Sequence, residues 1–296
     1  MGYKRLLRIG TRKSKLAMAQ AQQVCAAIRE VYSDWEPELV PITTQGDRFL
    51  NVPITSLEGK GIFLKEIEAA LLQGEIDCAV HSMKDVPTEL HPHLCIGMIM
   101  KREDARDGLI AGNTLANLAR GSSIGTGSNR RKYQLLACRS DLQIKPVRGN
   151  VDTRIRKWQE GQYDALVMAM AGLKRMGLEH VVSQILSFET MLPAAGQGAI
   201  SIELRTRDEK LLERMLFLDD RDTHAAVDGE RAFLQGLGGG CDLPAGIYGE
   251  VREGRLHLSG RIIKEAGLAV IEGKASGAIE DARQIGKQLA RELLER

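Results

Sequence analysis

Strand-like and helix-like stretches alternate along most of the chain, and this alternation limits the folds that the chain can adopt. The apolar run LLRIGT (residues 6–11) precedes a helical pattern at residues 14–32, and CAVHSM (78–83) follows a helical stretch that ends at Gly74. The same order of apolar runs and helical stretches returns between residues 122 and 218. Strands separated by helices predict parallel sheets with helices on their faces, and therefore an α/β fold.

The pattern changes after about residue 220. Strand-like stretches at 245–251, 255–263 and 269–276 follow one another at short spacing, and a helical stretch at 280–296 comes last. These stretches predict an antiparallel meander covered by a helix, in a small α+β domain. A length of 296 residues allows two or three domains, and no internal repeat is visible.

Composition and charge exclude several classes of function. The 41 basic and 39 acidic residues leave a net charge of +2, so no overall field favours nucleic acid or a membrane surface. The five cysteines are scattered and odd in number, which indicates a reducing compartment rather than a disulfide framework. The basic start lacks the apolar run of a signal peptide, and no later run is long enough to span a bilayer. We therefore expect a cytoplasmic protein.

Basic residues gather where predicted strands give way to predicted helices. In α/β sheets ligands bind beyond the carboxyl ends of the strands, where helix N-termini offer free N–H groups. The residues at four such junctions are Thr11, Arg12 and Ser14; Ser82, Lys84 and Asp85; Ser128, Arg130 and Arg131; and Arg148, Gly149, Asn150 and Arg154. Ser, Thr and Asn are also ordinary helix caps. Four basic junctions in a nearly neutral chain nevertheless predict a cleft that holds several carboxylates through arginine.

The motifs of competing sites are absent. No hydroxyl residue follows Lys60 in EGKGIF, as a phosphate-binding G-x-x-x-x-G-K-[ST] loop requires, and GTGSNR fails the last position of G-x-G-x-x-G. A nucleotide site is therefore disfavoured. His91, His93 and Cys95 are close in sequence but have no second ligand pair, so we expect an exposed turn and no metal site.

Two residues have both a functional and a structural interpretation. Asp85 stands among basic residues, where a carboxylate either stabilises a developing cation or serves only as a helix cap or salt-bridge partner. Cys241 follows three glycines in LGGGCDLPAG (237–246) and is the only cysteine on a glycine-rich loop. It is either an ordinary loop residue or a reactive thiol.

Eight segments, taken in order, resemble the porphobilinogen deaminase (hydroxymethylbilane synthase) family. The segments are GTRKSKLAMAQ, EGKGIFLKEIE, AVHSMKDVPTE, GTGSNRRKYQLL, VRGNVDTRI, MAMAGLKRMG, LPAAGQGAISIE and LGGGCDLPAG. They extend from residue 8 to about residue 246, and the predicted meander beyond them carries no motif. Any one of these segments is a weak signal, whereas eight in the family's order make the resemblance specific.

The resemblance implies a fold of three domains. Two are periplasmic-binding-protein-like α/β lobes with a cleft between them, and the third is a small C-terminal α+β domain with a three-stranded antiparallel sheet. Residues 1–99 and 193–219 would form domain 1, residues 100–192 domain 2, and residues 222–296 domain 3, which carries the cysteine loop. The alternation of strands and helices does not by itself predict that 193–219 return to the first lobe.

The resemblance also implies roles for individual residues. Cys241 would hold a dipyrromethane cofactor, assembled from two substrate molecules, through a thioether. Asp85 would be the catalytic residue and contact pyrrole N–H groups. Further cofactor-binding positions would be Lys84, Ser128, Arg130 and Arg131. Substrate-binding positions would be Arg12, Ser14, Gln20, Lys60, Phe63, Arg148, Arg154 and Gln197.

The reaction that the resemblance implies belongs to haem (tetrapyrrole) biosynthesis. A monomeric transferase would condense four porphobilinogen molecules head to tail with loss of ammonia, and water would release the linear tetrapyrrole. Each substrate ring carries two carboxylates, which explains the basic junctions. A two-lobed binding protein for an acidic small molecule would explain the basic cleft but not the cysteine loop. A cysteine hydrolase would need a histidine, for which His224 and His257 are candidates without a supporting motif.

Overall fold

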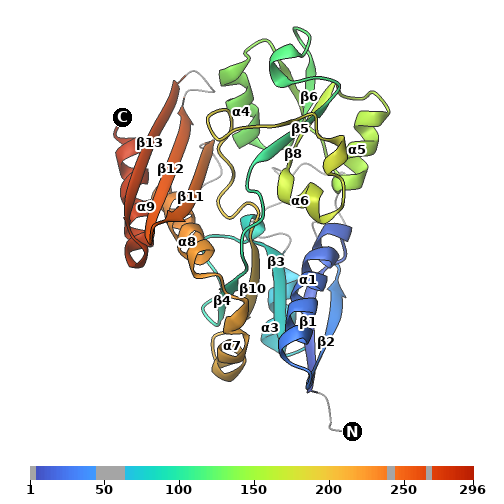
Figure 1. Ribbon diagram of the computed structural model, residues 1–296, viewed down its shortest axis with the longest axis vertical. Helices are drawn as coiled ribbons and strands as arrows, with labels where there is room; N and C mark the ends of the chain where they lie inside the picture. Colours follow the sequence, from blue (N-terminus) through green and yellow to red (C-terminus); the bar gives the residue numbers. More distant parts are fainter. Residues whose placement is uncertain (1–4, 45–63, 239–243, 265–268) are drawn as a thin grey trace. The chain divides into compact units, whose positions relative to one another are not determined.

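The computed structural model describes residues 5–44, 64–238, 244–264 and 269–296 (Figure 1). The chain forms two compact units. Unit 1 comprises Met1–Arg102 and Ala199–His224, and unit 2 comprises Glu103–Gly198 and Ala225–Arg296. The division into three domains predicted above has other boundaries and stays a prediction.

Unit 1 contains a five-stranded sheet with the strand order β2-β1-β3-β10-β4. The strands are β1 (Arg5–Arg12), β2 (Trp35–Ile42), β3 (Cys78–Ser82), β4 (Leu94–Ile99) and β10 (Ile200–Arg205), and the helices of this unit include α1 (Lys15–Val31), α3 (Lys65–Gln73) and α7 (Glu209–Met215). Strand β1 runs parallel to both of its neighbours, whereas β10 is antiparallel to β3 and β4. The predicted parallel pairing is confirmed for β2, β1 and β3, whereas β10 enters from a distant part of the chain and runs the other way.

Helices cover both faces of this sheet. Cys78 and Val80 of β3 pack with buried residues of α1, while Ala79 between them packs with buried residues of α3. Successive residues of a strand point to opposite faces, so β3 is apolar on both sides, as its continuous apolar sequence predicts. Strand β2 tolerates Pro37 because it lies at the edge of the sheet, where a missing N–H donor costs least.

Unit 2 contains a second five-stranded sheet, with the order β7-β6-β8-β5-β9. The strands are β5 (Asp107–Ala111), β6 (Ser123–Gly125), β7 (Gln143–Lys145), β8 (Ala165–Ala169) and β9 (Gln184–Ile185), and its helices include α4 (Asn129–Cys138), α5 (Val151–Gln159) and α6 (Met170–Arg175). Strands β7, β6 and β8 are parallel, and β5 is antiparallel to β8 and β9. The two five-stranded sheets thus share one topology, although the sequence shows no repeat.

The last part of the chain forms a three-stranded antiparallel sheet with α8 (Arg221–Gly236) and α9 (Ala282–Leu294) (Figure 1). Its strands β11 (Ala245–Arg252), β12 (Arg255–Lys264) and β13 (Ala269–Ala278) confirm the predicted meander. Gly286 of α9 lies against the backbone of α8, where an added Cβ would come within 2.1 Å of the Gly229 oxygen. Only glycine permits this close helix crossing.

Strand β5 and the cysteines carry two further details of the fold. The charged stretch 101–108 overlaps the start of β5, which conceals this strand in the sequence. Cys25 and Cys78 are buried, whereas Cys138 is exposed on α4. In the described part of the chain, every helix is too short or too polar to cross a bilayer.

Candidate functional site

The carboxyl edge of the unit 1 sheet brings two predicted junctions together. Strands β1 and β3 are parallel, so the residues that follow them meet at the same edge. Arg12 ends β1, and Ser14 caps α1 by accepting a hydrogen bond from the Ala17 N–H at 3.3 Å. The cap orients α1 with its positive end toward this edge.

Asp85 lies just beyond β3, at the end of a single 3₁₀ turn formed by Met83–Asp85. Met83 and Val86 are buried and hold the turn, while Lys84 and Asp85 are exposed. Among the described residues the Asp85 carboxylate has no hydrogen bond and no ion pair, and the N-cap of the turn is Ser82. Within the described ranges, Asp85 therefore has neither of the two structural roles considered above.

Gln20 is buried and bonds Ser82, the residue that begins this turn. Its buried amide donates from Nε2 to Ser82 Oγ at 2.9 Å and accepts from the same hydroxyl at Oε1, at 3.0 Å. The neighbouring His81 is buried, and its Nε2 lies 2.9 Å from Glu203 Oε2. Both contacts fix the backbone that leads into Lys84 and Asp85.

A buried carboxylate, Asp107, lies at the corresponding edge of the unit 2 sheet. Asp107 begins β5 and pairs with Ala169, the last residue of β8. Because β5 runs antiparallel to β8, its first residue lies where β6 and β8 end and where α4 begins. Antiparallel insertion of β5 thus brings an acidic side chain to an otherwise basic junction.

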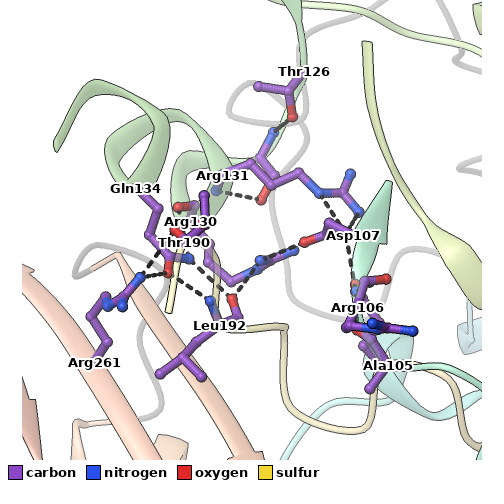
Figure 2. A network of polar contacts seen from close by, with 12 residues as sticks. Ala105, Arg106, Asp107, Thr126, Arg130, Arg131, Gln134, Thr190, Leu192 and Arg261 are labelled. Carbon is purple, nitrogen blue, oxygen red and sulfur yellow. Dashed lines mark hydrogen bonds and ion pairs between the residues drawn. The ribbon is translucent and has the colours of Figure 1, made fainter. Parts of the chain in front are cut away.

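Asp107 binds both arginines at the start of α4 (Figure 2). Arg130 Nη1 donates to Asp107 Oδ2 at 2.9 Å, and Arg131 donates to Oδ1 from Nη2 at 2.7 Å and from Nε at 3.2 Å. Burial alone would raise the pKa of Asp107, but the charges of Arg130 and then Arg131 outweigh it and hold this pKa well below its usual range. Burial lowers the pKa of Arg130, and Asp107 opposes that shift.

The first turn of α4 places cations where a helix favours anions. It contains Arg130 and Arg131 and no acidic residue, although the N-terminal end of a helix is the positive end of its dipole. The Ser128 hydroxyl accepts from the Arg131 N–H at 3.4 Å, which caps the helix. Among the described residues, the two guanidiniums share one carboxylate, so one positive charge stays unbalanced beside the N–H groups of the first helix turn. This is the donor set of an anion site.

Gln197 supports Asp107. It is fully buried, and its Nε2 donates to the Ala105 oxygen at 2.7 Å and to Asp107 Oδ1 at 3.0 Å. Its Oε1 is buried and has no partner among the described residues. This predicted substrate-binding residue therefore bonds the carboxylate that pairs with both arginines.

The junction between β7 and α5 adds Arg148 and Arg154 to the same edge of the sheet. Gly149 between them has φ +110°, and an added Cβ would come within 2.7 Å of Thr153. Arg154 donates from Nε to the Gly149 oxygen at 2.7 Å. Only glycine allows this tight entry to α5, which sets both arginines beside its N-terminus.

Three predicted site residues, Cys241, Lys60 and Phe63, lie outside the described residues. Both sides of the cysteine segment are described. Gly238 follows α8 with φ +91° and donates its N–H to the Gln235 oxygen at 3.0 Å. Pro244 accepts a hydrogen bond from the Ile263 N–H at 2.9 Å, which fixes the entry to β11.

Sequence reasoning missed two residues of the unit 2 edge. Asp107 lies within the charged stretch 101–108, and the signal that could have found it is the apolar run GLIA that begins at Gly108. Arg175 ends α6 and donates to the Gly198 oxygen at 2.8 Å, and burial lowers its pKa. His91 and His93 are exposed as expected, and the described residues contain no cluster of three or more metal-ligating side chains.

The fold and these junctions define an α/β protein with arginine-rich sheet edges suited to polycarboxylates. Comparison with known proteins gives the family. Residues 7–213 match the family model "Porphobilinogen deaminase, dipyromethane cofactor binding domain", and residues 224–295 match "Porphobilinogen deaminase, C-terminal domain". The chain belongs to the porphobilinogen deaminase family.

Relatives support the same assignment over nearly the whole chain. The porphobilinogen deaminase of Natranaerobius thermophilus is 47% identical, over 98% of this chain and 95% of that protein. The porphobilinogen deaminase of Geobacter sulfurreducens is also 47% identical, over 97% of this chain and 91% of that protein.

Among solved structures, a periplasmic substrate-binding protein of an ABC transporter from Coxiella burnetii matches 72% of this chain and 91% of its own. The identity is 14% and the TM-score 0.44. A TM-score this low does not establish a common fold.

Proposed function

We propose that this protein is a porphobilinogen deaminase, a transferase that condenses four porphobilinogen molecules head to tail and releases ammonia at each step. Water then releases the linear tetrapyrrole. The observation that carries the proposal is the match of both family domains, which together cover residues 7–213 and 224–295. A binding protein without chemistry would have no use for a dipyrromethane-binding domain, so we reject that alternative.

The described residues suit a polycarboxylate cofactor. The N-terminus of α4, with Ser128, Arg131 and one unbalanced positive charge, provides donors that match carboxylate oxygens. Dipyrromethane, when bound through Cys241, supplies a free pyrrole α-carbon as nucleophile. Arg131 would hold cofactor carboxylates, while Arg130, committed to Asp107 and to the Leu192 oxygen at 2.7 Å, would support Arg131.

Asp85 would supply the catalytic charge. Positive charge develops on the substrate as ammonia leaves its aminomethyl group, and an ionised carboxylate near the pyrrole N–H stabilises that charge. The exposed position of Asp85 and its lack of a partner among the described residues leave the carboxylate free for this role. Lys84 beside it would bind cofactor carboxylates, and Arg12 on the neighbouring strand would bind substrate carboxylates, with Ser14 at the cap of α1.

Cytoplasmic location, a monomeric state, the cleft and the roles of Arg148, Arg154, Lys60 and Phe63 stay predictions. The hydrolase alternative gains no support from its histidines. His224 Nδ1 lies 2.7 Å from Asp219, and His257 is exposed on β12.

Intact mass spectrometry tests the proposal. Purified protein should be heavier than its sequence by two linked pyrrole units, and it should release ammonia when porphobilinogen is added. Cys241→Ala should have the sequence mass, fold normally and release no ammonia, whereas Cys138→Ala, a matched change at an exposed cysteine, should behave as the original protein. A protein at sequence mass that gains no pyrrole with porphobilinogen would refute the proposal.

A further inference from the structure

Arg261 is a buried arginine that the proposed reaction does not use. It lies on β12, and its side chain is almost fully buried. Burying a guanidinium costs solvation free energy, and an apolar side chain of similar volume would pack there without that cost. A buried ionic group of this kind is retained in several proteins because it fixes one arrangement of neighbouring elements.

The partners of Arg261 lie on three different parts of unit 2, and Figure 2 shows Gln134 and Thr190 among them. Its Nη1 donates to Gln134 Oε1 on α4 at 2.8 Å and to the Thr190 oxygen at 3.2 Å. Its Nη2 donates to the Glu189 oxygen at 2.7 Å, and its Nε to Glu272 on β13. One side chain therefore joins the three-stranded sheet, the segment before Leu192 and the helix that begins with the arginine pair.

Gln134 extends these contacts to the arginines. Its Oε1 also accepts from the Leu192 N–H at 2.9 Å, and its Nε2 donates to the Leu192 oxygen at 3.0 Å. The same Leu192 oxygen accepts from Arg130 Nη1, whose other partner is Asp107. A continuous path of buried hydrogen bonds thus runs from Arg261 to the Asp107–Arg131 ion pair.

The other end of the path is the strand that follows the cysteine segment. Arg261 pairs in register with Gly246 on β11, five positions after Cys241. Gly246 lies against Leu192, where an added Cβ would come within 2.7 Å of the Leu192 Cβ, and the Ile247 N–H donates to the Pro193 oxygen at 2.9 Å. Phe188 and Tyr248 stack at 4.0 Å and strengthen the same contact.

We infer that Arg261 and Gln134 are positioning residues, which hold the strand after Cys241 in a fixed relation to the arginine pair of α4. The inference rests on the proposed function, in which Cys241 anchors the dipyrromethane and Arg131 binds its carboxylates. Its consequence is that the network sets how fast the cofactor is assembled, because an anchor and a carboxylate site that shift relative to each other no longer accept the same two rings.

The test follows cofactor loading rather than turnover. Cofactor-free protein, prepared from cells that make no porphobilinogen, is mixed with porphobilinogen, and the covalently loaded fraction is followed by intact mass. Arg261→Met and Gln134→Met should load roughly ten- to a hundredfold more slowly at saturating porphobilinogen. The double variant should be no slower than the slower single variant, since both changes interrupt one path.

Two controls separate positioning from general stability. Arg255→Met removes an exposed arginine from the same strand, and Ile285→Val weakens the core of the same sheet without touching the network. Both should load at the rate of the original protein, whatever small change in Tm they cause. If Arg261→Met does not fold, Arg261→Lys takes its place, because one ammonium cannot reach Gln134, Thr190 and Glu189 together.

The outcomes are distinguishable. The inference would be overturned if folded Arg261→Met (or Arg261→Lys in its place) and Gln134→Met both load cofactor at the rate of the original protein. The proposed function would then stay intact. Slow loading by Ile285→Val to the same degree would also overturn it, because the effect would then follow stability alone. Failure of the original protein to load would overturn both proposals.

Discussion

Each five-stranded sheet has a carboxylate at its ligand-side edge, but the two carboxylates differ in burial and in ion pairing. In unit 1, Asp85 follows a parallel strand, is exposed and has no ion pair among the described residues. In unit 2, Asp107 begins an antiparallel strand, is fully buried and holds two arginines. An exposed carboxylate without a partner keeps its charge for a ligand, whereas a buried one is committed to its own fold. The same topology thus leaves one carboxylate exposed to solvent and commits the other to an internal ion pair.

The largest expected effect is on the architectural carboxylate. Asp107→Asn should lower the free energy of unfolding by about 3–5 kcal/mol, because two buried guanidiniums lose their counterion. Urea denaturation measures the change. Asp141→Asn is the matched control, since Asp141 pairs with Arg139 at the surface and its loss should matter far less. Equal losses in the two variants would remove the distinction between the two sheet edges.

Asp85→Asn should lower activity strongly and leave stability almost unchanged. Single-turnover ammonia release by protein already loaded with cofactor should fall about a hundredfold, because the amide cannot stabilise positive charge in the transition state. The free energy of unfolding should stay close to that of the original protein, since Asp85 is exposed. Near-normal ammonia release would show that the charge of Asp85 is not catalytic.

A smaller effect is expected at Arg148, which has no ion pair within the described part of the chain. Arg148→Leu should raise the porphobilinogen concentration needed for half-maximal rate about tenfold, which corresponds to ~1.4 kcal/mol, with little change in stability. Arg156→Leu in the last turn of α5 removes an exposed arginine away from the junction, as a control. The interpretation of Arg148 as a substrate ligand fails if the two variants have the same half-saturation concentration.

The smallest effect concerns pH. The pKa of Asp107 is lower in the folded protein than in the unfolded chain, so its stabilisation is fully present above the usual carboxylate range of about pH 4. As the pH falls from about 4 toward the folded pKa, this contribution declines by at most ~1.4 kcal/mol per pH unit. Unfolding free energies of the original protein and Asp107→Asn, measured between these limits, should converge. A constant difference across that range would contradict the shift.

Much of the site was predictable because it depends on local sequence. Ser14 and Ser128 cap helices that follow strands, and helix capping is decided by a few neighbouring residues. Gly149 shows its role in the same way, through a backbone conformation that other residues avoid. Asp107 was missed because its role depends on pairing with Ala169, which is distant in sequence.

The sequence by itself determined the alternation of strands and helices, the closing meander, the basic junctions and the family resemblance. These follow from periodicity, capping and motif order, which are properties of neighbouring residues. Only the tertiary structure decided that β5 and β10 insert antiparallel into sheets of one topology, that Gln20 bonds the Ser82 hydroxyl and that Gln197 bonds Asp107. It also decided that Arg261 reaches α4 from β12. The physical reason is that strand pairing and buried hydrogen bonds join residues far apart in the chain, and a local pattern carries no record of which distant partner will satisfy them.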